Sequence, residues 1–558
     1  MIRRREVRTK QDGRNGGTLI MRSTFFGLET ARRGMVTQQA ALYTTGHNIS
    51  NANTPGYTRQ RVDFTTTTPY PSPGLNRPGI AGQMGTGVEA GSVTRIRDQF
   101  ADLQYRTQNN KVGYFGAARE AMVKMEEIMN EPSDSGLHTT MENFWNSLQT
   151  LASNPENTGA RDVVGASGQM VADTFNYYYN SLSRVQQDIG NQIEVTAKEI
   201  NDTIKSIHNL NKQIAEVEPH GFLPNDLYDS RDQLVDQLSA LVNIKVTAVK
   251  PTDYGMATGI ADGLYNIEMV KEDGNSYQPP IHLIEVTEAS GLKGYSEIGV
   301  VPNLIENTNS PITSITINGE ELLNNNIDFG GELAGLIHSY GYRTVDGEGN
   351  SFISGTYPSM IEKLNNMAQS FAEEFNRIHA SGYALGETDH PGDVDTSHFF
   401  EFDAISPAQT LKVKQTILDN PSTIRAGQAN GDAGDNKNAQ LLADLKTKPF
   451  SQYGDEDDAN YENPTERFSM TGNLDTFYSG VIGALGVDSK SAYQNLTNAN
   501  IISASIENRR QSTTSVSLDE EMVNMIKFQH AYNASARNIT VVDEMLDKII
   551  NGMGVVGR

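Results

Sequence analysis

The stretch LDEEMVNMIKFQHAYNASARNITVVDEMLDKIIN, residues 518–551, decides the fold, because apolar residues recur along it every seven positions. The series consists of Leu518, Met525, Tyr532, Ile539, Leu546 and Met553, and it is widened by Met522, Phe528, Val542 and Ile549. Seven-residue spacing sustained over this length predicts a coiled-coil helix rather than a helix of a globular core. At about 1.5 Å per residue, the helix would be roughly 54 Å long.

The N-terminal segment carries a shorter version of the same pattern, with Leu28, Met35, Leu42 and Ile49 at seven-residue steps. A single helix cannot bury its own apolar stripe. We therefore expect the two ends of the chain to pair with each other, with neighbouring copies of the chain, or with both. Packing of each helix within its own domain is the alternative, but both ends carry the pattern and no further element follows on which they could pack.

The run HNISNANTPGYTRQ, residues 47–60, comes directly after the first helix. Asparagine suits a helix end, and Pro55-Gly56 fits the two central positions of a type II turn, after which Tyr57 can pack back on the helix. On local grounds this is a helix cap followed by a turn. The motif as a whole comprises Asn48, Asn51, Asn53, Thr54, Pro55, Gly56, Tyr57, Thr58, Arg59 and Gln60.

Bulk properties exclude several classes of function. A chain of 558 residues predicts three or four domains, and a formal charge of −24 argues against nucleic acid and against anionic membrane surfaces as partners. No apolar run approaches the roughly 18 residues of a membrane span, so we expect no membrane insertion. The absence of cysteine excludes disulfides, thiolate metal sites and cysteine nucleophiles. Residues 1–20 are polar and aperiodic, and we expect a disordered extension there, or a start codon assigned too far upstream.

The interior of the chain predicts a helical layer interrupted by β-rich segments. Ile193, Ile200, Ile207 and Ile214 again repeat every seven residues, and NDLYDSRDQLVDQLSALVNIKV (225–246) runs from an amphipathic helix into a β-branched strand. We therefore predict an α+β multidomain fold with long coiled-coil-like terminal helices, a helical inner domain and β-rich outer insertions. The predicted parts are a terminal domain of residues 21–62 with 505–558, an inner domain of 63–246 with 332–384 and 471–504, a β-rich insertion of 247–331, and a mixed, largely β insertion of 385–470.

We find no catalytic motif. The best candidate for a metal site is the loop ETDHPGDVDTSHFFEFD (387–403), which places Asp389, His390, Asp393, Asp395 and His398 close together. Its spacing is not that of an EF-hand, and acidic residues among glycine and proline usually form a solvated loop, as does the run DEDD at 455–458. The sequence therefore predicts a protein that is not an enzyme and that needs no cofactor or metal.

Several motifs resemble those of bacterial flagellar axial proteins. HNISNANTPGYTRQ is similar to the Asn-rich TPGY signature of rod, hook and hook-associated proteins, and residues 518–551 resemble their C-terminal segment. The version TPGYTRQ, the stretch VTRIRDQFADLQYR (93–106) and the segment 225–246 resemble the hook-associated protein 1 family in particular. The most recognisable positions of that interior motif are Arg231, Asp232, Leu234, Val235 and Leu238.

The resemblance implies a structural adaptor at the junction of hook and filament, outside the cell, exported without a cleaved signal peptide. It implies as partners other copies of the chain in a ring, the hook protein, a second hook–filament junction protein, a cytoplasmic export chaperone that covers the C-terminal helix, and the type III export apparatus. It further implies that the apolar residues of both terminal helices pack between subunits. Another axial component, an enzyme or metal module in the β insertions, and a surface adhesin are the rival interpretations.

Overall fold

The computed structural model describes residues 24–71, 82–129, 133, 136–257, 259–302, 304, 310–321, 328–346, 348–388, 397–429, 431–454 and 462–552. The predictions for residues 1–20, for Met553, for Asp389, His390, Asp393 and Asp395, and for the run 455–458 lie outside these residues. The described residues form two compact units. The first takes them from Met1–Asp98, Phe222–Asp229 and Gln511–Arg558, and the second from Gln99–Gly221 and Ser230–Arg510.

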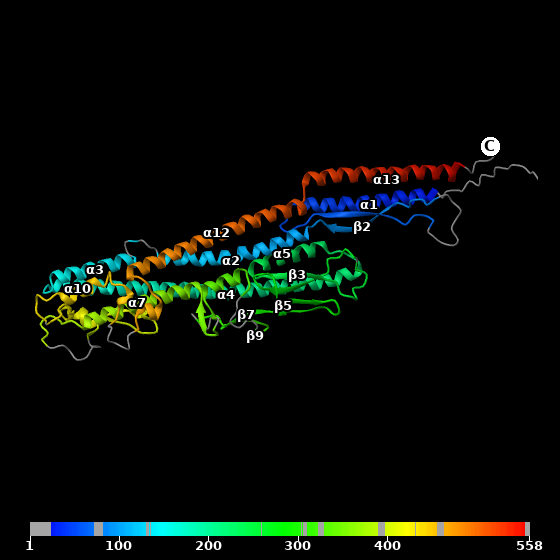
Figure 1. The fold of residues 1–558 in the computed structure, drawn as a ribbon. Helices are drawn as coiled ribbons and strands as arrows, with labels where there is room; N and C mark the ends of the chain where they lie inside the picture. Colours follow the sequence, from blue (N-terminus) through cyan, green and yellow to red (C-terminus); the bar gives the residue numbers. More distant parts are fainter. Residues whose placement is uncertain are drawn as a thin grey trace, which may run out of the picture. The chain divides into compact units, whose positions relative to one another are not determined.

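The first unit is built on the two terminal helices. Helix α1 (Thr24–Ser50) lies beside α13 (Leu518–Gly552), as the sequence predicts for the chain ends (Figure 1). The antiparallel strands β1 (Gln60–Thr66) and β2 (Val88–Arg95) also contact α1, and Thr37 Oγ1 donates to Val88 O at 3.1 Å. Because these strands pack on α1, this unit runs to Asp98 and resumes at Gln511 near the C-terminus, whereas the sequence places the domain boundaries at residues 62 and 505.

The second unit is organised around α4, one continuous helix over Thr158–Val217. The pattern suggests two separate helices, 161–182 and one around Ile193–Ile214, but no proline interrupts the sequence between them, and the helix continues through Gly190. Ile193, Ile200, Ile207 and Ile214 are completely buried, as expected for a core stripe. Gly190 leaves room for Tyr340, whose ring would lie 3.0 Å from a methyl group at that position.

The remaining long helices of this unit pack around α4 or beside it. They are α2 (Gln99–Met129), α3 (Leu137–Ser153), α5 (Asn225–Leu241), whose first residues belong to the first unit, α6 (Glu332–Tyr340), α7 (Thr356–Ala380) and α12 (Leu474–Thr514). An aromatic cluster joins α3 and α7. It consists of Phe144, Trp145, Phe371, Phe375, Phe399 and Phe400. The core therefore consists of helix-to-helix contacts supplemented by aromatic rings.

Strands follow α5, as its sequence predicts. One antiparallel sheet has the order β3 (Ile244–Val249), β4 (Leu264–Val270), β5 (Ser276–Thr287) and β6 (Gly291–Tyr295) and contacts α4 (Figure 1). A second sheet consists of β7 (Ile298–Val301), β8 (Ser314–Ile317) and β9 (Glu320–Glu321), and a hairpin pairs β10 (Tyr342–Val345) with β11 (Ser351–Ser354). Strands thus occupy the described part of the predicted insertion 247–331.

The described part of the segment 385–470 is not largely β, contrary to prediction. Its described part contains two strands of two residues, β12 (Phe400–Glu401) and β13 (Lys412–Val413), and the short helices α8 (Pro407–Thr410), α9 (Gln415–Asp419), α10 (Lys437–Asp444) and α11 (Pro464–Phe468). Prolines at the first helical positions and the side chain of Asn463, which accepts from Thr465 N, favour such short helices. Besides the short pairing of β12 with β13, the segment is anchored by buried aromatics such as Phe399 and Phe400, which join the aromatic cluster.

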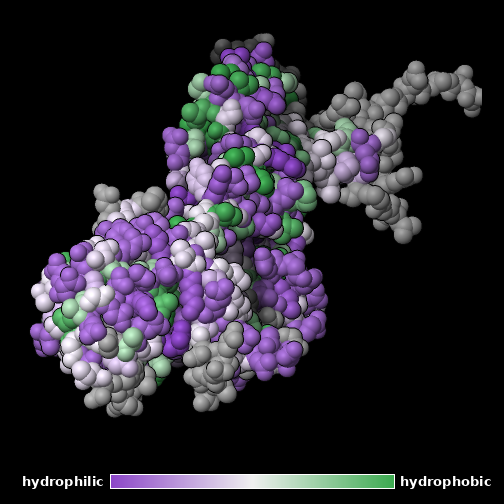
Figure 2. All heavy atoms as spheres, turned by 60° about the vertical axis from the view of Figure 1, so that its left-hand side comes forward, coloured by the Kyte–Doolittle hydropathy of each residue, from purple (hydrophilic) through white to green (hydrophobic). Residues whose placement is uncertain are grey.

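Most of the visible surface is hydrophilic, with hydrophobic patches scattered among charged side chains (Figure 2). In the described residues, no helix has the length and apolar character needed to cross a membrane.

Candidate functional site in the paired terminal helices

The seam between α1 and α13 is antiparallel and uses small residues. A methyl group on Gly27 would lie 3.9 Å from Val542 Cγ2, and one on Gly34 would lie 3.1 Å from Ser535 Oγ. Further along, Asn48 Nδ2 donates to Glu521 Oε2 at 3.2 Å. In an antiparallel helix pair that keeps one register, the residue numbers of facing residues add up to a constant. The sum is the same in these three contacts, so a single register extends along the seam.

The large apolar residues of α1 lie one position away from this seam. Leu28, Met35, Leu42 and Ile49 are all half-buried, whereas Ala41, next to Leu42, is buried. Glycine and alanine at the seam let the two backbones approach closely, as at other helix interfaces lined by small residues. The heptad series therefore identifies the pairing helix but not the residues at its closest contact.

On α13 the residues of the predicted stripe differ in exposure, and Leu518 and Ile549, which keep the heptad positions of Met525 and Val542, lie near the ends of the helix. Met525, Phe528, Tyr532, Ile539, Val542 and Leu546 are half-buried, and the ring of Phe528 lies edge-on to that of Phe64 with centroids 6.0 Å apart. Leu518, Met522 and Ile549 are exposed, together with Val523, Ile526, Val541, Met545 and Ile550. Pairing within one chain thus covers only part of the apolar surface of α13.

The turn after α1 has the predicted form. Tyr57 N donates to Thr54 O at 3.2 Å, and Gly56 at its third position has a φ of 79°, which favours glycine. Asn51 Nδ2 donates to His47 O at 3.1 Å and so satisfies a carbonyl at the helix end. Asn53, Thr54, Pro55 and Gly56 are exposed at the tip of the turn.

Asn48 is the centre of the motif, with 1% of its surface exposed. Its Oδ1 accepts from Tyr57 Oη at 2.8 Å and from Gln60 N at 3.0 Å, and its Nδ2 donates to Gln60 O at 2.8 Å as well as to Glu521. His47 Nδ1 lies 2.9 Å from Tyr57 Oη, whose own proton goes to Asn48. Every hydrogen-bonding position of this buried amide is therefore used.

Arg59 joins the motif to the start of α13. Its Nε donates to Glu521 Oε1 at 2.8 Å and its Nη1 to Glu520 Oε2 at 2.7 Å, while its backbone N–H donates to Thr514 O at 2.9 Å. Glu521 is 2% exposed, whereas Glu520 lies at the surface. Carboxylates in the first turn of a helix are also favoured by the helix dipole.

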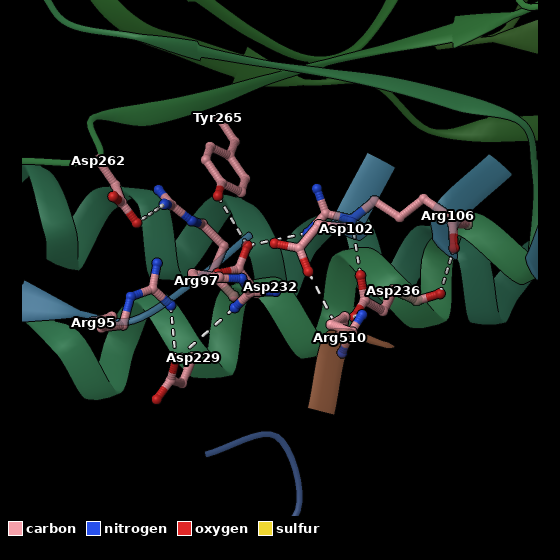
Figure 3. A network of polar contacts seen from close by, with 12 residues as sticks. Arg95, Arg97, Asp102, Arg106, Asp229, Asp232, Asp236, Asp262, Tyr265 and Arg510 are labelled. Atoms are coloured by element: carbon pink, nitrogen blue, oxygen red, sulfur yellow. Dashed lines mark hydrogen bonds and ion pairs between the residues drawn. The ribbon is translucent and has the colours of Figure 1, made fainter. Parts of the chain in front are cut away.

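The other side of the motif contacts the first residues of α5, within the same unit. Thr58 N donates to Asp229 Oδ2 at 2.9 Å, and Gln60 Nε2 donates to Asp226 Oδ1 at 3.1 Å. Arg95 Nη1 pairs with Asp229 Oδ1 at 2.7 Å (Figure 3). Burial raises the pKa of Asp229 in spite of Arg95, and burial together with nearby carboxylates raises the pKa of Tyr57.

The predicted interior motif lies in the second unit, and four of its five residues are buried. The guanidinium of Arg231 stacks on the Tyr265 ring at 3.5 Å and donates to Gly263 O at 2.7 Å. Asp232 Oδ1 accepts from Tyr265 Oη at 2.9 Å (Figure 3). Val235 and Leu238 are fully buried, while Leu234 is half-buried. These residues connect α5 to β4, so their role is structural.

A charged cluster in the second unit was not predicted. Asp236 accepts from Arg106 Nε at 2.8 Å and from Arg510 Nη1 at 2.6 Å, and Arg510 also lies 3.7 Å from Asp102 (Figure 3). Arg510 comes from α12 and has no recognisable motif around it. Asp236 lies within the segment 225–246, and Asp102 and Arg106 lie within the stretch 93–106; the sequence singled out both segments but not their contact.

Among the described residues, no group of histidine and carboxylate side chains is arranged to hold a metal ion. His398 is described, but the rest of the proposed acidic ligand set lies outside the described residues. The arrangement of the first unit serves chain pairing and offers an apolar helix face.

Comparison with known proteins gives consistent matches along the chain. The family model described as flagellar hook-associated protein FlgK helical domain matches residues 122–394. A flagella basal body rod protein model matches 28–58, and a flagellar basal body rod FlgEFG protein C-terminal model matches 498–552. The last two contain most of α1 and the whole of α13 respectively.

Whole-chain relatives carry one name. Flagellar hook-associated protein 1 of Bacillus subtilis (strain 168) is 42% identical over 544 residues, which cover 96% of this chain and 100% of the relative. The protein of the same name from Escherichia coli (strain K12) is 24% identical over 570 residues, covering 94% and 99%. The structure of the flagellar hook junction protein FlgK from Burkholderia pseudomallei matches 74% of this chain and 100% of its own, at 14% identity and a TM-score of 0.48.

Proposed function

The chain belongs to the flagellar hook-associated protein 1 family, and from this premise we propose that it forms the junction between hook and filament. It is a structural axial protein, an adaptor layer on which the next junction protein and flagellin assemble. The observation that carries the proposal is the outer face of α13. A long helix that remains apolar after pairing with α1 needs a further partner, and copies of the chain in a ring supply one.

Two kinds of interaction account for the two faces of α13. The half-buried face is covered by α1 of the same chain, and the exposed Met522, Ile526 and Met545 on the outer face pack on neighbouring copies in the ring. Before assembly the same face binds the cytoplasmic export chaperone, which prevents premature association. The chain then leaves through the type III export apparatus and contacts the hook protein on one side and the second junction protein on the other.

The exposed tip of the turn, Asn53–Gly56, is the part of the motif free to reach a neighbouring subunit. Asn48, Thr58, Arg59 and Gln60 are engaged within their own chain. Replacing Asn51 or Asn53 with Ala, or Gly56 with Val, therefore impairs assembly more than it impairs folding of the second unit. Normal motility in all three variants argues against a role of this turn in assembly.

The experiment that tests the function is deletion of the gene, scored by negative-stain microscopy and by flagellin in the medium. The expected result is hooks without filaments and flagellin lost to the medium. Missing hooks would make the chain a hook or rod component, which is the second candidate because rod-protein models match both ends. Intact filaments would contradict an axial role altogether.

Complementation with point variants tests the outer face of α13. Met522→Asp and Ile526→Asp place a charge on the exposed apolar face and should leave filaments unassembled, because a carboxylate is costly to bury between subunits. Asn538→Asp introduces the same charge at an exposed polar position on another side of the same helix and should restore filaments. Equal complementation by all three variants would remove this face from the assembly surface.

A further inference from the structure

The seam between α1 and α13 is almost periodic along its length. Gly27 faces Val542 and Gly34 faces Ser535, and the same register places Ala41 opposite Phe528. If α13 slipped by seven residues, about 10.5 Å, Gly34 would face Val542 and Ala41 would face Ser535. Small residues would again meet small or apolar ones, so these layers distinguish poorly between the two registers.

The layer of Asn48 and Glu521 is the exception. A slip of seven residues in one direction places Asn48 opposite Phe528, and a slip in the other places Glu521 opposite Ala41. In either case a buried amide or a buried carboxylate loses its partner, and an unpaired buried polar group is far more costly than an exchanged apolar contact. The penalty therefore falls on every register except the observed one.

We infer that Glu521, held by Asn48 and Arg59, sets the register in which the two terminal helices pair. Single polar layers fix register in coiled coils in the same way, and they do so at the expense of stability. The inference concerns the pairing of α1 with α13 that the proposed function also uses. It names a residue that specifies this pairing, in a helix turn whose sequence, LDEE, looks like an ordinary acidic helix start.

Two neighbouring features offer a competing explanation. Arg59 N donates to Thr514 O at 2.9 Å, and only Ser515–Ser517 connect α12 to α13. Either of these could fix the position of α13 without any contribution from Glu521. A test must therefore remove the side-chain layer and leave the backbone connection in place.

The chain contains no cysteine, so pairs of introduced cysteines report the register directly. A Cβ at position 34 would lie 3.9 Å from Ser535 Cβ, which is a suitable distance for a disulfide. Gly34→Cys with Ser535→Cys reports the observed register. Gly34→Cys with Val542→Cys and Gly34→Cys with Phe528→Cys report the two registers displaced by seven residues.

The experiment oxidises the purified full-length chain and identifies disulfides by non-reducing electrophoresis and peptide mass spectrometry. In the parent background we expect the 34–535 disulfide and neither displaced one. In the Glu521→Leu background we expect displaced disulfides as well. Glu520 is the exposed partner of Arg59, with 62% of its side chain exposed. Glu520→Leu removes this partner and serves as the matched control that should keep the single register.

Three results would overturn the inference. If Glu521→Leu forms only the 34–535 disulfide, the backbone connection sets the register. If Glu520→Leu gives the same displaced products, the effect is not specific to the buried layer. If the parent forms no 34–535 disulfide, the helices do not hold this register in the chain.

Should Glu521→Leu lose its helical circular dichroism, the uncharged pair Arg59→Gln with Glu521→Gln replaces it as the test, with a smaller share of displaced disulfides expected. A single register in this double variant would equally contradict the inference. The readout needs no flagellum. A negative result in the gene deletion therefore leaves the register inference standing, and a negative result here leaves the junction role standing.

Discussion

Asn48 and Glu521 lie 473 positions apart in the sequence, and a hydrogen bond of 3.2 Å joins them at the point where α1 ends and α13 begins. The bond closes nearly the whole length of the chain into a loop. The two ends therefore cannot form this site separately, and their stability depends on each other.

The first prediction concerns the buried amide. Asn48→Ala leaves Tyr57, Gln60 and Glu521 without their shared partner, so the paired helices should lose about 1–3 kcal/mol of stability. Hydrogen exchange of the α13 amides in the full-length chain measures this loss as faster exchange. Asn53→Ala, at an exposed position of the same motif, should leave the exchange unchanged. Equal exchange in the two variants would show that the amide network does not stabilise the pair.

The second prediction concerns the close approach of the helices. Gly34→Leu inserts a side chain where even a methyl group would lie 3.1 Å from Ser535 Oγ, so α13 should be displaced from α1. Limited proteolysis should then cut α13 faster. Gly46→Leu is the control, since no heavy atom lies within 4 Å of a methyl group at that position of the same helix. Similar cleavage of the two variants would contradict the close seam.

How much of this site the sequence predicts depends on what the seven-residue apolar pattern indicates about a helix. Seven-residue spacing indicated that α1 and α13 each have a face to bury, but it left open whether the partner is the other end of the chain or a neighbouring copy; the structure has α1 beside α13 of the same chain. The spacing did not identify Gly27 and Gly34 as the seam, because small residues leave no apolar signal. Nor did it separate Met525, which lies towards α1, from Met522, which is exposed, since both are equally apolar.

The polar half of the site was less predictable still. Asn48, Arg59 and Gln60 were singled out by their motif, but Glu521 lies in an acidic first turn where carboxylates are common. Its burial depends on Arg59, which the sequence places far away. The same limit explains the segment 385–470, where glycine, asparagine and proline indicated turns but could not tell whether strands or short helices connect them.

The third prediction concerns the charged cluster of the second unit. Arg510→Ala removes a guanidinium that pairs with Asp236 at 2.6 Å and stacks over the Tyr105 ring at 4.5 Å. Because the remaining carboxylates are buried, the loss should be about 3 kcal/mol in urea unfolding of the full-length chain. Arg184→Ala, at an exposed position of α4, should change stability by less than about 0.5 kcal/mol. A loss for Arg510→Ala as small as that of the control would show that the cluster contributes little.

The fourth prediction concerns pH and rests on His379 in α7. Burial lowers the pKa of His379 to about 3, with Arg425, His398 and Arg161 adding to the effect. The neutral ring is held on both nitrogens, since Nδ1 donates to Ser397 O at 2.7 Å and Nε2 accepts from Arg425 N at 3.1 Å. The folded chain therefore keeps this side chain unprotonated down to acidic pH.

The direction of this pH effect on stability follows from the pKa of His379 in the unfolded and in the folded chain. The unfolded chain binds a proton at His379 below a pKa of about 6.5, whereas the folded chain does so only near 3. The stabilisation is therefore complete above the unfolded pKa and is lost as the pH falls, by about 1.4 kcal/mol per pH unit. Urea unfolding between neutral pH and the mildly acidic range should show this slope in the parent chain. His379→Gln, which cannot titrate, should unfold more easily at neutral pH and lack that part of the slope, and an unchanged slope would assign the pH dependence to other groups.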